Sequence, residues 1–181
     1  VSADAAAGWL KNAILGNQAG MEMHQSRKAV DRIGYEHLRY EQRYRGIPVE
    51  FSMYIVHTRE GRIVSANGEA YTNIQLDVTP SVSVESAKQI ARKAFPAGRY
   101  LASPNDAEPA LMVLPVKDGQ FCLVYKIDVY TEEPLSRQWV YVSAKTGAVV
   151  RSVNRLETFN VQATAGTQYS GTQSITTDSL S

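Results

Sequence analysis

The chain has 181 residues, 44% of them hydrophobic, and its 19 basic and 18 acidic residues leave a net charge of +1. This length and composition suit one ordinary domain or two small ones. The balanced charge argues against a nucleic-acid partner, and no apolar run reaches the roughly 18 residues that a membrane span needs. The start, VSADAAAGWL, lacks the pattern of a signal peptide, so any export signal is expected to have been removed or left out.

The first 34 residues predict one helix followed by a loop. Within residues 5–15, apolar side chains recur at helical spacing, at Ala6, Trp9, Leu10, Ala13 and Ile14. Asp4 precedes this stripe and is the expected N-cap. The next stretch, GNQAGMEMHQSRKAVDRIG, is polar and has no clean period, so we expect it to be mainly loop.

Three antiparallel strands are predicted between residues 35 and 67. In the first strand, one buried face alternates with one solvated face. The buried face consists of Leu38, Tyr40, Gln42 and Tyr44, and the solvated face of His37, Arg39, Glu41 and Arg43. The second strand is expected to bury a face made of Ile47, Val49, Phe51, Met53 and Ile55. A turn at Gly61 then leads into a short third strand.

The second half repeats the order of one helix and several strands. Ser83 is the expected N-cap of a helix that ends before Pro96. Its apolar stripe is Val84, Ala87, Ile90, Ala91 and Ala94. Strands are expected at Leu111–Val116, Phe121–Tyr130, Gln138–Ser143 and after the turn SAKTG. The fold class predicted for the chain is therefore α+β, with two units that each pack a helix on a curled antiparallel sheet.

Burial and domain limits follow from these patterns. The boundary is expected between residues 76 and 81, near Pro80. From Thr158 onward the chain is rich in Thr, Ser, Gly and Gln and resembles a tail or linker. The residues expected to be mainly buried are Tyr40, Val49, Phe51, Ile55, Ile90, Leu123, Tyr125, Ile127 and Trp139. The lone cysteine, Cys122, is expected to be a small buried hydrophobe in a strand.

The sequence contains no recognisable catalytic set. His24, His37 and His57 form no HExxH motif, and a metal site from His37 and His57 would need a third ligand that no spacing supplies. Carboxylates at Glu36, Glu41, Glu50, Glu132 and Glu133 have basic neighbours and are expected to form surface pairs. Strand alternation places Arg39 and Arg43 opposite Tyr40 and Tyr44, which argues against a stacking platform for nucleic acid.

The stretch HLRYEQRYRGIPVEFSMYIVHTREGRIVSANG, residues 37–68, resembles the signature of the fungalysin/thermolysin propeptide domain. That signature reads H-x-R-Y-x-Q, then G-[IV]-P-V, then a strand ending in His, then G-x-[IV]-x-S-x-N-G. The positions that match are His37, Arg39, Tyr40, Gln42, Gly46, Ile47, Pro48, Val49, His57, Gly61, Ile63, Ser65, Asn67 and Gly68.

The second half resembles a PepSY domain, although that pattern occurs in many contexts. The matching residues are Leu123, Tyr125, Ile127, Val129, Trp139, Tyr141, Val142, Ala144, Thr146, Gly147 and Val149. Both resemblances imply two cystatin-like units. The implied domains are 1–78 (propeptide-like), 79–156 (PepSY-like) and 157–181, which looks like the junction and the start of a mature peptidase whose first strand spans Gly166–Asp178.

These resemblances imply the prosegment of a secreted thermolysin-like zinc metallopeptidase. Such a segment is expected to be no enzyme itself, and to act as an intramolecular chaperone and inhibitor. Its partner would be the cognate catalytic domain, which would hold the zinc and calcium, whereas no cofactor is expected in this chain. The implied location is extracellular or periplasmic. The alternatives are a free-standing extracellular inhibitor or binding module built from the same two domains and, with no motif in support, an enzyme that uses His37 and His57 between the domains.

The resemblance also implies where the prosegment is removed. Thermolysin-like enzymes favour a bulky apolar residue just after the scissile bond, which selects the bonds before Leu156, Phe159 or Val161, with the latter two preferred. An ordinary linker open to any protease is the alternative. The inhibitory segment is then expected to consist of Val153, Asn154, Arg155, Leu156, Glu157, Thr158, Phe159 and Asn160.

Overall fold

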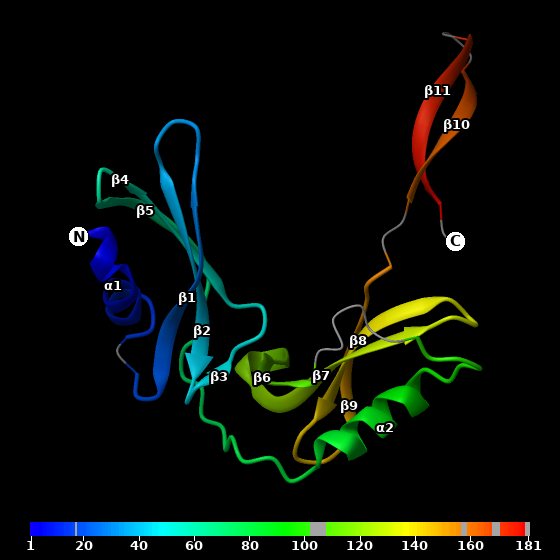
Figure 1. Cartoon of the computed structure of the whole chain (residues 1–181), viewed down its shortest axis with the longest axis horizontal. Coiled ribbons are helices and arrows are strands. Elements are labelled where there is room, and N and C mark those ends of the chain that lie inside the picture. Colours follow the sequence, from blue (N-terminus) through cyan, green and yellow to red (C-terminus); the bar gives the residue numbers. More distant parts are fainter. Residues whose placement is uncertain (17, 102–107, 157–158, 168–170, 180–181) are drawn as a thin grey trace.

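The computed structural model describes residues 1–16, 18–101, 108–156, 159–167 and 171–179. Two sheet-based units lie next to each other, and a separate hairpin follows them (Figure 1). The helical elements are η1 (Ala3–Ala5), α1 (Ala6–Ala13), α2 (Val84–Ala94) and η2 (Lys117–Gly119). The predicted α+β class with antiparallel sheets is confirmed. Within the described part of the chain, no helix is long and apolar enough to cross a membrane.

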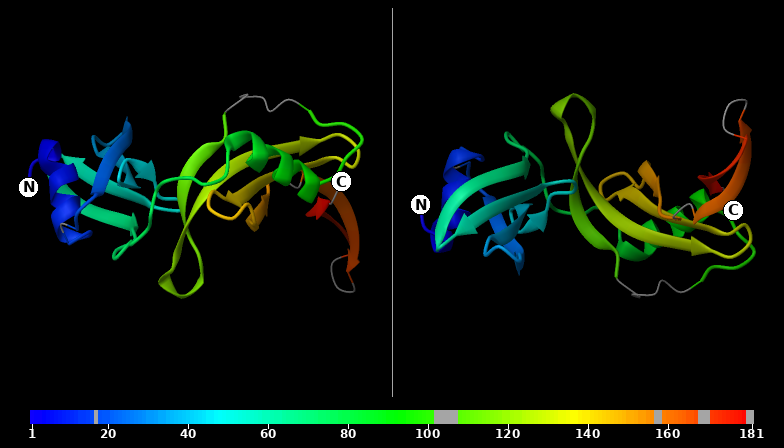
Figure 2. Two further views of the ribbon diagram at one scale, coloured as in Figure 1. Left: turned by 90° about the horizontal axis from the view of Figure 1, so that it is seen from below. Right: turned by 90° about the horizontal axis from the view of Figure 1, so that it is seen from above.

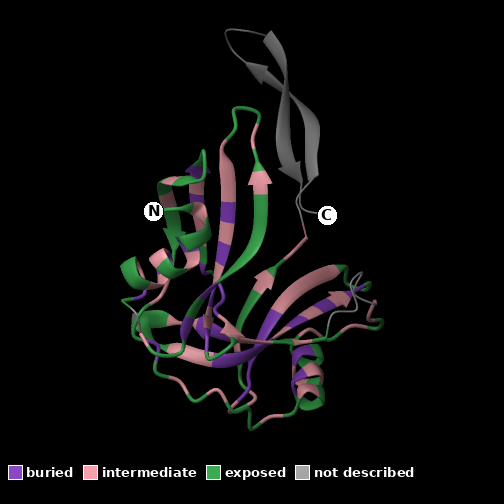
Figure 3. Ribbon diagram, turned by 60° about the vertical axis from the view of Figure 1, so that its left-hand side comes forward, coloured by how far each residue is buried: buried purple, intermediate pink, exposed green. Residues whose placement is uncertain are grey.

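The first sheet is antiparallel and has the order β1-β2-β4-β5, with β3 paired to β2. Its strands are β1 (Met21–Val30), β2 (Glu36–Tyr44), β3 (Ile47–Pro48), β4 (Met53–Arg59) and β5 (Arg62–Glu69). Ala6 and Leu10 of α1 share its core with Leu38, Tyr40 and Val56. Along β2, buried residues alternate with partly exposed ones, as Figure 3 shows. The faces predicted for β2 are confirmed.

The second sheet has the order β6-β7-β8-β9 and is also antiparallel. Its strands are β6 (Ala110–Pro115), β7 (Phe121–Thr131), β8 (Ser136–Ser143) and β9 (Val149–Asn154). Ala87 and Ala91 of α2 pack on Leu123, Ile127 and Val140. The backbone N–H of Ser86 donates to the Ser83 hydroxyl at 3.2 Å, so the predicted N-cap is confirmed. Figure 2 shows α2 lying along the second sheet, away from the first unit.

The last two strands form a hairpin of their own. They are β10 (Phe159–Thr167) and β11 (Gly171–Ser179), which pair antiparallel with each other. In Figure 1 this hairpin projects away from both sheet units. The predicted single strand at Gly166–Asp178 is therefore wrong, because its described residues belong to two different strands, β10 and β11, that pair with each other.

The loop predicted for residues 16–34 is wrong over most of its length, because Met21–Val30 form strand β1. This strand lies at the edge of the first sheet and pairs with β2. Only its first residues, Met21 and Met23, are buried, while the following side chains face water. A strand that buries so little leaves no apolar alternation in the sequence, and this hid it. The Asp4 cap is also wrong, since α1 begins after Ala5 without a side-chain cap.

The buried face predicted for the second strand is reversed in β4. Phe51 and Met53 are 44% and 46% exposed, whereas Ser52, Val56 and Thr58 are buried. The chain turns between β3 and β4, where Phe51 adopts a φ of 60° and the Ser52 hydroxyl donates to the Val49 carbonyl at 2.6 Å. A shift by one residue moves every side chain of a strand to the other face. The turn thus breaks the alternation that the sequence suggested.

Other burial predictions have mixed outcomes. Tyr40, Val49, Leu123, Tyr125 and Ile127 are buried as predicted. The side chains that are only half-buried are Ile55, Ile90, Cys122 and Trp139. Trp139 lies on the sheet face opposite α2, where it joins a smaller cluster around Leu114, Val124 and Tyr141.

Candidate functional site

A chain of polar side chains crosses the face of the first sheet that lies opposite α1. Asp31 Oδ2 lies 3.3 Å from His37 Nε2, and the Nδ1 atoms of His37 and His57 are 2.7 Å apart. His57 Nε2 continues the chain to Asn67 Oδ1 at 2.8 Å. Hydrogen bonds from the Tyr35 and Ile33 backbone amides and from His37 lower the pKa of Asp31. The register places His37 directly opposite His57 on neighbouring strands.

Gln42, on the other face of β2, fixes the segment that leaves the first sheet. Its fully buried side chain accepts from Tyr71 N at 2.8 Å and donates to Tyr71 O at 2.6 Å. The amide therefore pairs with both backbone groups of one residue. Gly68, at the end of β5, meets another close approach, since a Cβ there would lie 2.1 Å from the Met53 carbonyl oxygen. Gln42 and Gly68 are both positions of the propeptide signature, and these contacts give each of them a structural role.

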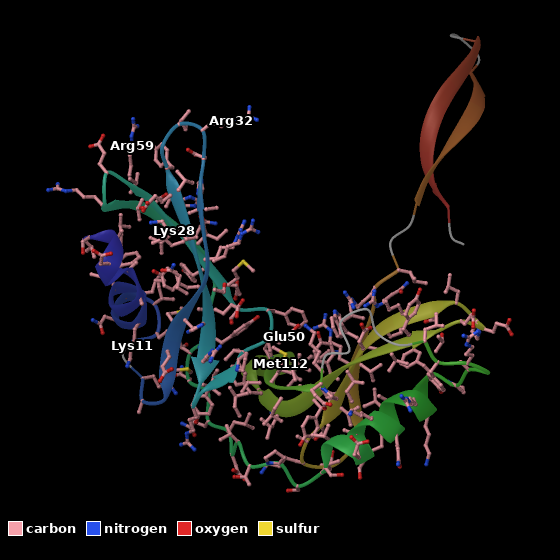
Figure 4. All side chains as sticks on the ribbon, viewed as in Figure 1. Lys11, Lys28, Arg32, Glu50, Arg59 and Met112 are labelled. Carbon is pink, nitrogen blue, oxygen red and sulfur yellow. The ribbon has the colours of Figure 1, made fainter. Side chains whose placement is uncertain are left out.

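The two units meet at Glu50. Its backbone N–H donates to the Val113 carbonyl at 2.8 Å, next to an isolated bridge between Val49 and Val113. Its carboxylate accepts from Lys126 Nζ at 2.6 Å and from the Tyr141 hydroxyl at 2.8 Å. Figure 4 shows Glu50 of the first unit facing Met112 of the second, where the two sheets adjoin. The Tyr141 hydroxyl is the donor of this hydrogen bond, and burial together with the Glu50 carboxylate raises the pKa of Tyr141.

Arg155 holds the segment that follows β9 on the second sheet. Its contacts lie on the face opposite α2, where Trp139 and Tyr141 also lie. Its backbone N–H donates to the Arg137 carbonyl at 2.8 Å, and its Nη1 donates to Asp128 Oδ2 at 2.9 Å. The guanidinium carbon also lies 4.1 Å from the centre of the Trp139 ring. Arg137 grips the same carboxylate through Nη2 and Nε, at 2.7 and 3.2 Å, and this pairing raises the pKa of Arg137. We call Asp128, Arg137, Trp139 and Arg155 the junction clamp.

The predicted inhibitory segment begins inside this framework. Val153 and Asn154 are the last residues of β9 and pair with Trp139 and Gln138. Arg155 and Leu156 follow, and the Leu156 N–H donates to the Asn154 side chain at 3.0 Å. Glu157 and Thr158 lie outside the described residues. Phe159, Asn160 and Val161 open β10. The cleavage positions at Leu156, Phe159 and Val161 stay predictions.

Sequence reasoning missed the residues that carry most of these contacts. Glu50 was expected to form a surface pair, but it is 8% exposed, while Glu36 and Glu132 do form such pairs with Lys28 and Arg99. The sequence pattern assigned no contact to Asp128 or Lys126. A usable signal was present, because the predicted hairpin of β7 and β8 places Trp139 opposite Asp128 and Tyr141 opposite Lys126.

These clusters are suited to holding chain segments. Among the residues that the structure describes, no group of three or more His, Cys, Asp or Glu side chains is arranged to hold a metal ion. We call Glu50, Lys126 and Tyr141 the seam between the units. The Asp128 carboxylate of the clamp and the Glu50 carboxylate of the seam both accept hydrogen bonds from basic or hydroxyl donors. A carboxylate with so little exposure is costly to separate from its partners, so these pairs hold the segments that carry them in place.

Comparison with known proteins agrees with the sequence pattern. Residues 22–70 match the Fungalysin/Thermolysin Propeptide Motif. The chain is 28% identical over 150 residues to thermolysin of Alicyclobacillus acidocaldarius subsp. acidocaldarius, covering 79% of this chain and 27% of that protein. It is 31% identical over 135 residues to bacillolysin of Bacillus subtilis (strain 168), covering 70% and 26%, and 29% identical over 141 residues to bacillolysin of Bacillus amyloliquefaciens, covering 72% and 26%.

The motif and these relatives together support a thermolysin-like propeptide, as the resemblance predicted. The chain spans 27% and 26% of the length of the thermolysin and the bacillolysins it matches. The matched motif contains His37, Gln42, Glu50, His57, Asn67 and Gly68. It ends at residue 70, so the PepSY resemblance of the second half stays a prediction.

Proposed function

We propose that this chain is the prosegment of a secreted thermolysin-like zinc metallopeptidase and acts as its intramolecular chaperone and inhibitor. The observation that carries the proposal is the propeptide motif at residues 22–70, together with relatives that cover most of the chain. The partner is the cognate catalytic domain, which holds the zinc and calcium, and the complex works outside the cytoplasm. Cleavage near the junction after β9 then releases the peptidase.

A secreted protease survives digestion through a high barrier to unfolding, and slow folding accompanies such a barrier. A prosegment that docks on the half-folded catalytic domain lowers this barrier. The two sheets suit that role because their outer faces carry polar groups in fixed positions. An example is the row of hydrogen-bonded side chains that begins at Asp31 and ends at Asn67. A docking area of at least about 800 Å² per partner is expected, as for stable protein–protein complexes.

The proposal assigns different tasks to different parts of the chain. Two cystatin-like units, residues 1–78 and 79–156, would provide the docking surface. Residues 157–181 would be the junction and the start of the mature peptidase. The inhibitory segment Val153–Asn160 would lie across the active-site cleft and exclude substrate. Its first residues are already fixed by β9 and the junction clamp, which supports a defined exit point for the chain.

Inhibition of the cognate peptidase by the purified chain tests the proposal. The full chain should inhibit at micromolar concentration or below, and should accelerate recovery of activity when the denatured peptidase refolds. A variant that ends after Leu156 keeps β9 and the clamp, so it should fold and bind but inhibit much more weakly. A chain that binds the peptidase without inhibiting it or aiding its refolding would contradict the proposal and favour the free-standing binding module.

A further inference from the structure

We infer that Arg155 is a positioning residue for processing: it holds the Arg155–Leu156 bond on the second sheet, so that cleavage falls further along the chain. The inference rests on the proposed function only for the identity of the processing enzyme. Three contacts from different chemical groups carry it, namely a backbone hydrogen bond, a charged pair and a ring contact.

The backbone hydrogen bond of Arg155 uses a group that a protease would need in order to bind this segment. The Arg155 N–H donates to the Arg137 carbonyl, and this extends the pairing of β9 with β8 beyond Asn154. Proteases bind their substrates as extended strands, through the same backbone groups that a sheet uses. The segment around Arg155 therefore has to leave β8 before it can enter an active site. Cleavage at a paired position then depends on local opening of the sheet.

The side chain makes this opening costly. Asp128 has a side chain that is only 6% exposed, and it is held from two sides by Arg137 and Arg155. Withdrawing Arg155 removes a guanidinium partner from a buried carboxylate, and such partners are strongly favourable at sites with little water. It also removes the guanidinium carbon from its place 4.1 Å from the centre of the Trp139 ring, and so ends a cation–π contact.

These contacts separate the three candidate cleavage bonds. The bond before Leu156 joins two residues that are both fixed, because the Leu156 N–H donates to the Asn154 side chain and Arg155 is clamped. The bonds before Phe159 and Val161 lie beyond the clamp, in β10, which belongs to the separate two-stranded sheet with β11. A two-stranded hairpin is at best marginally stable by itself, so it opens more easily than the clamped second sheet. A peptidase that cuts before bulky apolar residues should therefore spare Leu156 and cut at one of the other two positions.

Limited digestion with trypsin tests the clamp without the cognate peptidase, since trypsin cuts after arginine and the test bond is Arg155–Leu156 itself. The reference is the bond after Arg32, an exposed residue at the tip of the β1–β2 hairpin (Figure 4). In the unaltered chain, cleavage after Arg155 should be at least about tenfold slower than after Arg32, a factor that corresponds to about 1.4 kcal/mol. Mass spectrometry of early fragments measures both rates.

Asp128→Asn is the decisive variant, because it weakens the clamp and leaves Arg155 available to trypsin. The rate after Arg155, relative to Arg32, should rise about tenfold. Asp77→Asn makes the same chemical change at an exposed ion pair and should leave the ratio unchanged. Cleavage after Arg43, within β2, reports global unfolding. If Asp128→Asn proves unfolded by this measure, Trp139→Leu replaces it, with the same expected increase.

Two results would overturn the inference. One is equal cleavage after Arg155 and Arg32 in the unaltered chain, and the other is an unchanged ratio in a folded clamp variant. A second arm uses a thermolysin-like peptidase on Arg155→Ala, which should yield a new fragment that begins at Leu156. The trypsin arm stands apart from the proposed function, because a chain that fails to inhibit any peptidase can still protect this bond.

Discussion

The Nδ1 atoms of His37 and His57 lie 2.7 Å apart, at directly paired positions of β2 and β4. A nitrogen–nitrogen contact of this length has room for one proton, which one ring donates and the other accepts. Their Nε2 atoms are held by Asp31 at one end and Asn67 at the other. The four residues therefore act as one hydrogen-bonded unit that joins the β1–β2 turn to β2, β4 and β5.

Replacing His57 by Ala should destabilise the chain by about 0.5–1.5 kcal/mol, because it removes the hydrogen bonds to His37 and Asn67 from a half-buried position. Urea unfolding monitored by circular dichroism measures the change. The matched control is His24→Ala, an exposed histidine on β1, which should change stability by less than about 0.5 kcal/mol. Equal effects at both histidines would contradict the role of the polar chain.

Replacing Gln42 by Leu should cost about 2–4 kcal/mol. The substitution leaves the N–H and the carbonyl of Tyr71 without the buried amide that pairs with both, and each unsatisfied buried polar group costs about 1–3 kcal/mol. Gln89→Leu, on an exposed position of α2, is the control and should have little effect. Hydrogen exchange at Tyr71 should accelerate in Gln42→Leu alone, which separates loss of this contact from general destabilisation.

Replacing Ile127 by Ala should cost about 2–5 kcal/mol, because this side chain is 6% exposed and packs in the core between α2 and the second sheet. Val64→Ala, at a side chain that is 57% exposed, should change stability by less than about 0.5 kcal/mol. Thermal or urea unfolding compares the two variants. A small effect at Ile127 would show that this face of β7 does not form the core.

The protein should lose a little stability in acid through protonation of Asp77, which pairs with Lys145. Hydrogen bonds from Lys145 and Thr79 lower the pKa of Asp77 from 3.8 to about 2. A lowered carboxyl pKa stabilises the fold above the unfolded value, and this contribution is lost as the pH falls from 3.8 toward 2. The effect should be small, since the side chain is 68% exposed and water screens the pair.

The measurement is the urea midpoint at pH 5 and at pH 2, for the unaltered chain and for Asp77→Asn. The difference between the two proteins should be larger at pH 5 than at pH 2. Lys145→Met removes the same ion pair from its other side and should lose part of this pH dependence as well. A difference that stays constant with pH would rule out Asp77 as its source.

Local patterns in the sequence were sufficient for the elements with one buried face. Alternation identified β2 and β7, and the Ser83 cap with its apolar stripe identified α2. The residues of the propeptide motif were also visible, because the pattern is dense over residues 37–68. These features depend on neighbours in the chain, which a linear sequence displays directly.

Tertiary structure alone decided the rest. The edge strand β1 is stabilised by pairing with β2 and carries little apolar pattern, and the turn at Phe51 reversed the faces of β4. The junction clamp unites Asp128 with Arg137 and Arg155, and the seam unites Glu50 with Lys126 and Tyr141. Each of these charges looks solvated in the sequence. They become partners at sites with little water only when strand register and the contact between the units bring distant residues together. A charged pair depends on distance in space and on the exclusion of water.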